Sequence, residues 1–182
     1  QIGSYGLYFG RITEEKGVET VVQAYEKLQK YTVKIMGDDT TEEAIRLKRY
    51  IKEHKIKNIE FLGFKSGEEL EDIIKGARFT LIPSIWYDNL PNTALESFQY
   101  SKPVIASNIG SLPELVVDGE NGYLFKPADA EDLIKKIKLL DDDTVVEKMG
   151  AASRRRLESR FSPETHYEAL MKVFSEAVKN NK

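Results

Sequence analysis

The sequence contains no cysteine, which excludes disulfide bonds, thiolate metal ligands and a cysteine nucleophile. It also lacks both glycine signatures of phosphate binding, G-x-G-x-x-G and G-x-x-x-x-G-K-[ST]. An ordinary dinucleotide-binding fold and a P-loop nucleotidase are therefore unsupported. Because the absence of cysteine fits a reducing compartment, we expect a cytoplasmic protein.

Long apolar runs are missing too. No stretch approaches the roughly 20 apolar residues of a membrane span, and no signal peptide is visible. The 182 residues carry 27 Lys and Arg against 30 Asp and Glu, and a net charge of −3 gives no reason to expect nucleic acid. The basic run Arg154–Arg156 is interpreted as a solvated helix face, with peripheral membrane contact as the alternative. We expect no metal and no cofactor, because the two histidines lack a ligand pattern.

Short apolar runs alternate with helical patterns along most of the chain. This alternation predicts an α/β fold with three layers, in which helices cover both faces of a parallel sheet of about six strands. Three more helices follow at the C-terminal end. We expect residues 1–182 to form a single domain, cut from a longer protein because the chain starts in a strand without methionine. Ser66 and Glu69 have the spacing of a capping box at a helix start. The predicted strands are Tyr5–Phe9, Thr32–Met36, Asn58–Leu62, Phe79–Ile82, Pro103–Ala106 and Tyr123–Phe125.

In parallel sheets of this kind, ligands bind beyond the carboxyl ends of the strands, where the strand order reverses. The loops after the first and fourth strands are the candidates, namely Arg11–Gly17 and Asp88–Thr93. Arg11 and Lys16 place two cations in the first loop, where they would neutralise a diphosphate. The alternative is that both are surface cations beside Glu14 and Glu15.

The second candidate loop leads into a helix. Pro91 suits the first helical position, where its missing N–H group is not needed. The N–H groups of Asn92, Thr93 and Ala94 then point outward at the positive end of the helix dipole, which favours phosphate. Trp86, just before this loop, is interpreted as a packing residue rather than a platform for a sugar.

Two carboxylates flank this helix start. Asp88 precedes it, and Glu96 lies about one turn inside, where it could accept hydrogen bonds from sugar hydroxyls. A phosphate seat between two carboxylates suggests a nucleotide-sugar site.

Segments along essentially the whole chain resemble, in order and spacing, the C-terminal half of the retaining glycosyltransferases of family four. That family has two facing Rossmann-like domains, and its C-terminal domain binds the donor. The matching segments are Y-F-G-R-I-T-E-E-K-G-V-E-T-V-V, V-K-I-M-G, I-E-F-L-G-F, D-N-L-P-N-T-A-L-E-S-F, S-K-P-V-I-A-S-N-I-G-S-L-P-E-L-V and D-G-E-N-G-Y-L-F.

The resemblance implies a Rossmann-like domain that binds a nucleoside-diphosphate sugar. The complete enzyme would transfer the sugar to an acceptor hydroxyl with retention, and a missing N-terminal domain would hold the acceptor, a glycan, lipid or small molecule. The segment alone would then be inactive. The implied roles are the diphosphate for Arg11, Lys16, Asn92 and Thr93, the ribose for Glu96, the donor sugar for Asp88, the base for Gly63, Phe64 and Lys65, and a loop beside the cleft for Gly110–Glu114.

One departure stands at the first carboxylate of the motif. The family usually has glutamate there, followed by Phe-Gly, whereas this chain has Asp88 followed by Asn89 and Leu90. Aspartate is shorter by about 1.5 Å, one carbon–carbon bond. Asp88 therefore either moves with its loop and acts in catalysis with Glu96, or only orients sugar hydroxyls. A sugar-nucleotide epimerase of the same architecture and a non-catalytic nucleotide-sugar-binding module are the alternatives.

The last predicted helix, Pro163–Val178, resembles the one that packs back onto the missing domain. Its apolar positions include Tyr167, Leu170, Val173 and Phe174. Without a partner domain they would be exposed, and we expect self-association of the isolated chain.

Overall fold

The computed structural model describes residues 2–87 and 89–180, and its centre is a sheet of six parallel strands. The strand order is β3-β2-β1-β4-β5-β6, so the order reverses between β1 and β4. The predicted α/β fold with a parallel sheet is confirmed. The strands are β1 Tyr5–Phe9, β2 Thr32–Met36, β3 Ile59–Gly63, β4 Ala77–Ile82, β5 Val104–Ser107 and β6 Gly122–Phe125.

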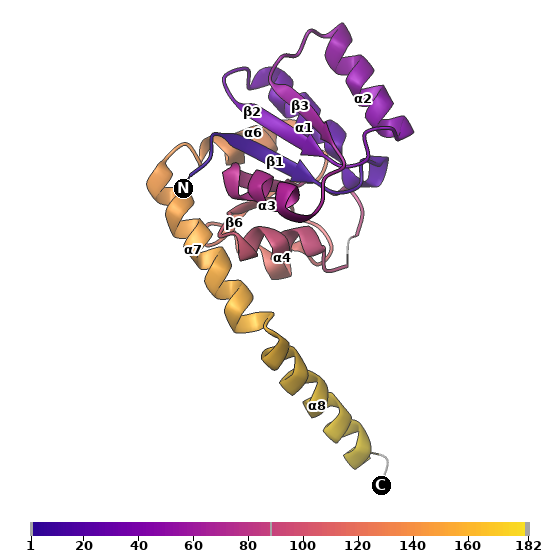
Figure 1. Ribbon diagram of the computed structural model, residues 1–182. Helices are drawn as coiled ribbons and strands as arrows, with labels where there is room; N and C mark the ends of the chain where they lie inside the picture. Colours follow the sequence, from indigo (N-terminus) through magenta and orange to yellow (C-terminus); the bar gives the residue numbers. More distant parts are fainter. Residues whose placement is uncertain (1, 88, 181–182) are drawn as a thin grey trace.

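Helices connect the strands and cover both faces of the sheet (Figure 1). On one face, α1 packs beside α6 and α2, and on the other face α4 packs against α7. The helices are α1 Val18–Lys27, α2 Glu42–Glu53, α3 Gly67–Gly76, α4 Asn92–Gln99, α5 Leu112–Leu115, α6 Ala130–Lys138, α7 Asp143–Arg160 and α8 Pro163–Asn180, with a short 3-10 turn at Glu14–Lys16.

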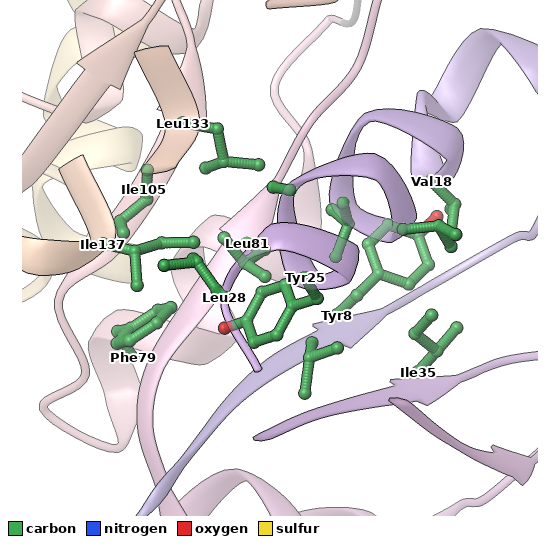
Figure 2. Packing of buried hydrophobic residues seen from close by; sticks show 14 of the residues in the cluster. Tyr8, Val18, Tyr25, Leu28, Ile35, Phe79, Leu81, Ile105, Leu133 and Ile137 are labelled. Atoms are coloured by element: carbon green, nitrogen blue, oxygen red, sulfur yellow. The ribbon is translucent and has the colours of Figure 1, made fainter. Parts of the chain in front are cut away.

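The strands divide their side chains between the two faces because successive residues point to opposite sides. In β1, Tyr8 joins the core under α1 and α6, whereas Leu7 and Phe9 join a second cluster with Ile74 of α3. Figure 2 shows the first cluster, in which Tyr8 and Tyr25 lie between the sheet and α1. Burial on both faces explains why β1 reads as one continuous apolar run.

The predicted capping box at Ser66 is wrong. The Ser66 side chain makes no capping hydrogen bond, and Glu69 forms an ion pair with Lys65 at 2.6 Å instead. Gly67 starts the helix with a left-handed backbone, φ +59°, so the first turn does not aim its amides at the Ser66 hydroxyl as a regular helix start does.

The last helix, α8, extends away from the body of the domain (Figure 1). Ser162 caps it, because its hydroxyl accepts a hydrogen bond from the Thr165 N–H group at 3.2 Å. Its large apolar side chains remain exposed, including Tyr167 at 63% and Phe174 at 55%. In the described part of the chain, no helix is both long enough and apolar enough to cross a membrane.

Candidate functional site

The two candidate loops meet where the strand order reverses. β1 and β4 are neighbours in the sheet, and the loops that leave their carboxyl ends are joined by a hydrogen bond from the Ile85 N–H group to the Glu15 carbonyl, 3.0 Å. The two loops can approach this closely at Gly17, which has a left-handed backbone and lies against Pro83. The two loops therefore meet at the place where this type of fold binds its ligands.

A cavity of about 200 Å³ lies between these loops. Its lining includes Arg11 and Lys16 from the first loop and Asn92 and Thr93 from the start of α4, together with Ser84. The structure thus brings together all four residues that the sequence assigned to a diphosphate. The Arg11 side chain is 72% exposed and forms an ion pair with Glu15 at 3.8 Å.

The start of α4 differs from the prediction by one residue. Pro91 lies at the N-cap with an extended backbone rather than at the first helical position, and its carbonyl accepts a hydrogen bond from the Ala94 N–H group at 3.0 Å. The amide of Ala94 is therefore not available to a ligand. Among the described residues no group accepts from the amides of Asn92 and Thr93, so these two form the positive end of the helix dipole.

Glu96 lines a second, larger cavity of about 470 Å³, which shares Arg11 and Thr93 with the smaller one. Burial raises the pKa of the Glu96 carboxyl. Within the described part of the chain, no residue donates a hydrogen bond to this carboxylate. A half-buried carboxylate without a protein donor is a suitable acceptor for ligand hydroxyls.

Only two of the three residues predicted beside the base line a cavity. Phe64 and Lys65 line the larger cavity, but Gly63 does not; its carbonyl accepts the Gly37 N–H group at 3.1 Å instead. Phe64 is 75% exposed, and Lys65 is paired with Glu69. An exposed aromatic ring at the mouth of a cavity can cover the face of a planar base.

Sequence reasoning missed Asp38 and Thr41, which also line the larger cavity. Hydrogen bonds from the Thr40 hydroxyl and N–H groups lower the pKa of the Asp38 carboxyl. Their position in the chain could have identified them. Both follow the carboxyl end of β2, which is the neighbour of β1 in the sheet. Side chains at this edge of a parallel sheet converge on one crevice.

Two predictions concern the loop before α4. Asp88 lies outside the described residues, so its proposed contact with a sugar stays a prediction. Trp86 was interpreted as a packing residue, but its side chain is 67% exposed, and that interpretation is wrong for this chain. It protrudes from the same loop as Tyr87, which is 74% exposed. Neither side chain finds enough neighbouring apolar surface within the domain to be covered.

A larger groove, about 1000 Å³, lies elsewhere. It is lined by Gly3, Gly76 and Lys102, at the amino ends of the strands. The Lys102 ammonium donates to the carbonyls of Lys75, 2.6 Å, and Ala77, 2.8 Å, and so caps the end of α3. Size alone therefore does not mark the functional site. This groove is also lined by charged side chains, but it lies at the edge opposite to the carboxyl ends of the strands, where ligands of such sheets bind.

In the ranges 2–87 and 89–180, no group of three or more His, Asp or Glu side chains could hold a metal ion. Among the described residues, the charged side chains that line the two cavities are Arg11, Lys16, Asp38, Lys65 and Glu96.

Residues 4–156 match the protein family described as glycosyl transferases group 1. The chain belongs to this family. The resemblance found in the sequence is thereby confirmed, and the chain is a glycosyl transferase group 1 domain of the Rossmann-like kind.

The Gly110–Glu114 segment was expected beside the donor cleft. Ser111 and Glu114 line a separate groove next to α7 instead, and no residue of the segment lines the two cavities described above.

Curated relatives are similar over nearly the whole chain. A protein of Methanocaldococcus jannaschii described as an uncharacterized glycosyltransferase is 28% identical over 173 residues, which cover 95% of this chain and 48% of the relative. A glycogen synthase of Mycobacterium tuberculosis is 29% identical over 181 residues, which cover 97% of this chain and 43% of the relative. The chain therefore spans about half the length of these relatives.

Solved structures share the fold. Sucrose-phosphate synthase from Thermosynechococcus elongatus superimposes with a TM-score of 0.85 at 25% identity, covering 97% of this chain and 46% of the synthase. HepE from Anabaena, solved in complex with UDP and glucose, gives a TM-score of 0.85 at 20% identity over 95% of this chain and 48% of HepE. This glycosyl transferase group 1 chain corresponds in each case to about half of the larger structure.

Proposed function

We propose that this chain binds the nucleoside diphosphate of a sugar donor, and that the complete protein transfers the sugar to an acceptor hydroxyl with retention. One observation carries the proposal. Arg11, Lys16 and the two residues at the start of α4 line one cavity, which shares Arg11 and Thr93 with a second cavity lined by Glu96. Membership of the glycosyl transferases group 1 family and the fold shared with the UDP-bound HepE structure support it.

The chemistry of the crevice suits the leaving diphosphate. Negative charge develops on that group as the glycosidic bond breaks, and fixed donors aimed at it stabilise the transition state. Arg11 would bind phosphate oxygens through its forked guanidinium and Lys16 as a point charge. Each such charged hydrogen bond contributes about 1.5–3 kcal/mol. This arrangement supplies the positive charge from the protein, so the proposal includes no metal.

Glu96 is assigned to the ribose hydroxyls. Its half-buried carboxylate opens onto the larger cavity, and Phe64 stands at the same cavity with an exposed ring. The ribose and base would then occupy the larger cavity, while the diphosphate would occupy the smaller one. Asp88, by resemblance, would lie against the donor sugar.

The acceptor site is assigned to a further domain of the full-length protein. The relatives are about twice as long as this chain, and the large apolar side chains of α8 are exposed, as expected for a helix that another domain covers. The chain alone should therefore show little sugar transfer. The cytoplasmic location stays a prediction.

Binding of the donor can be tested directly. A thermal-shift screen of UDP-, GDP- and ADP-sugars should identify a base that stabilises the chain. Calorimetry with that nucleoside diphosphate should then show binding at least about tenfold weaker for Lys16→Ala, as expected for one lost charged hydrogen bond. Lys52→Ala, which removes an exposed lysine of α2, is the matched control. Unchanged affinity in Lys16→Ala would refute the assignment of Lys16.

The reaction itself needs the full-length protein. Product analysis should find a glycosylated acceptor with the anomeric configuration of the donor, and the yield should persist after treatment with a chelator. An inverted product would refute retention, an epimerised donor would favour the epimerase, and binding without turnover would favour a non-catalytic module.

A further inference from the structure

A second groove, of about 680 Å³, lies between α5 and the junction of α7 with α8. No residue that lines it also lines the two donor-site cavities. Its polar lining consists of two arginines, three hydroxyls and one carboxylate, contributed by Arg156, Arg160, Ser111, Ser159, Thr165 and Glu114.

The two arginines lie one turn apart on α7, so their side chains share one side of the helix. Arg156 is half-buried, which corrects the interpretation of Arg154–Arg156 as a solvated face: only Arg154 and Arg155 are exposed. A guanidinium nitrogen of Arg156 donates to the Glu114 carbonyl of α5. Its Nε atom is buried without an acceptor among the described residues.

These two arginines are not neutralised by an ion pair among the described residues. In the described part of the chain, neither Arg156 nor Arg160 forms an ion pair with a carboxylate, whereas Arg154 on the same helix pairs with Glu158 at 2.6 Å. Burial, and next the nearby charge of Arg160, lower the pKa of Arg156, while the charge of Glu120 opposes the shift. Like charges held together at a partly desolvated surface favour binding of an anion.

The remaining groups suit phosphate in particular. Guanidinium groups bind phosphate oxygens in a forked geometry, and hydroxyls supply further donors. The Ser111 hydroxyl also accepts a hydrogen bond from the Leu90 N–H group at 3.0 Å. Leu90 lies in the loop that leads into α4, so a ligand in this groove would touch the segment that ends at the donor site.

We propose that this groove is a second anion site, distinct from the donor site, which takes the phosphate group of a monoester or diester. Arg160 and Arg156 bind the charge, and Ser159 and Thr165 bind further oxygens. The phosphate can belong to a soluble phosphorylated compound or to an anionic phospholipid headgroup. The site does not depend on the proposed donor binding, because the two sites share no residue.

Inorganic phosphate is a suitable probe. In ¹⁵N-labelled protein at fixed ionic strength, phosphate should cause saturable amide shifts at Ser159 and Arg160, and a separate set of shifts at Arg11. Arg160→Gln should weaken the phosphate affinity measured from the first set about tenfold, as expected for the loss of one charged hydrogen bond. The affinity measured from the second set should stay unchanged. Arg155→Gln removes the same charge from an exposed position outside the groove and should change neither set.

The outcomes separate the two proposals. A groove without saturable shifts would overturn the second anion site, as would equal weakening by Arg160→Gln and Arg155→Gln, because the attraction would then be diffuse. If the Arg11 set alone were missing, the donor site would fail and the groove would stand.

A vesicle experiment identifies the source of the phosphate. The chain should be sedimented with phosphatidylcholine vesicles, with and without phosphatidylglycerol. Binding to the anionic vesicles that Arg160→Gln removes and Arg155→Gln retains would assign the groove to a lipid headgroup. Saturable phosphate shifts without vesicle binding would assign it to a soluble phosphate ester.

Discussion

Gly17 lies directly against Pro83, so that a Cβ atom at Gly17 would stand 2.0 Å from the Pro83 carbonyl oxygen. Gly17 also has φ +67°, in the left-handed region that favours glycine. The loop that carries Arg11 and Lys16 can approach the end of β4 only because this position has no side chain. The relationship between these two residues therefore fixes one wall of the proposed donor site.

Gly17→Ala should destabilise the protein and weaken nucleoside-diphosphate binding. The left-handed backbone costs about 1–2 kcal/mol for alanine, and the clash with Pro83 adds a further cost of about 1–3 kcal/mol. Gly119→Ala is the matched control, because Gly119 has φ +80° but no atom within 4 Å of its Cβ position. Urea denaturation should show the larger loss for Gly17→Ala, and equal losses would contradict the role of the close contact.

Glu96 should make both stability and donor binding depend on pH. Its folded-state pKa is raised by burial, so the folded state holds the proton more tightly than the unfolded chain does. The free energy of unfolding of the wild type should fall, relative to Glu96→Gln, as the pH rises from about the ordinary carboxyl pKa of 4.5 through the raised value. Over the same window the affinity for the nucleoside diphosphate should increase, because the ionised carboxylate is the stronger acceptor.

Parallel denaturation and calorimetry series can check both trends. Glu147→Gln, an exposed change on α7, controls for the loss of one negative charge. A wild type and a Glu96→Gln variant with the same pH profiles would show that Glu96 does not titrate in this window.

Lys102→Met should lower the free energy of unfolding by about 1–3 kcal/mol. Lys102 is only 6% exposed, and its ammonium group satisfies two carbonyls at the end of α3. Methionine keeps the apolar stem but leaves those carbonyls without their donor. Lys135→Met, at an exposed position of α6, should change the stability by less than about 0.5 kcal/mol. Similar stabilities for all three proteins would contradict a capping role.

The exposed face of α8 should cause self-association of the isolated chain. Replacing Leu170 and Phe174 by serine removes two large apolar side chains that are 42% and 55% exposed. Sedimentation velocity should then show less association at high protein concentration, without a loss of folded structure. The control replaces Glu168 and Lys172 on the same helix by serine, which preserves the net charge. A wild type that stays monomeric at all concentrations would refute this prediction.

Local pattern was sufficient for most of the fold. Strand β1 could be recognised from a single apolar run, because a strand buried on both faces needs apolar residues at every position. Ser162 could be recognised as a cap because it precedes a proline at a helix start. The capping box at Ser66 failed because the sequence does not reveal that Gly67 turns left-handed or that Lys65 takes the Glu69 carboxylate.

The candidate site was only partly predictable. Arg11, Lys16 and Glu96 were found because they follow strand ends or a helix start in recognisable segments. Asp38 and Thr41 were missed because their role depends on β2 lying beside β1. The availability of the Ala94 amide was predicted wrongly, since a helix that begins one residue later engages a different N–H group.

The sequence by itself determined the strands and helices, the family and the cations of the first loop, because these follow from short-range periodicity and from residue types at fixed spacing. Tertiary structure alone decided which groups meet. It placed Gly17 against Pro83 and left Trp86 exposed. It also placed the half-buried Arg156 beside Arg160. Contacts between segments distant in the chain depend on how the helices cover the sheet, and that packing sets the burial and charge of each functional group.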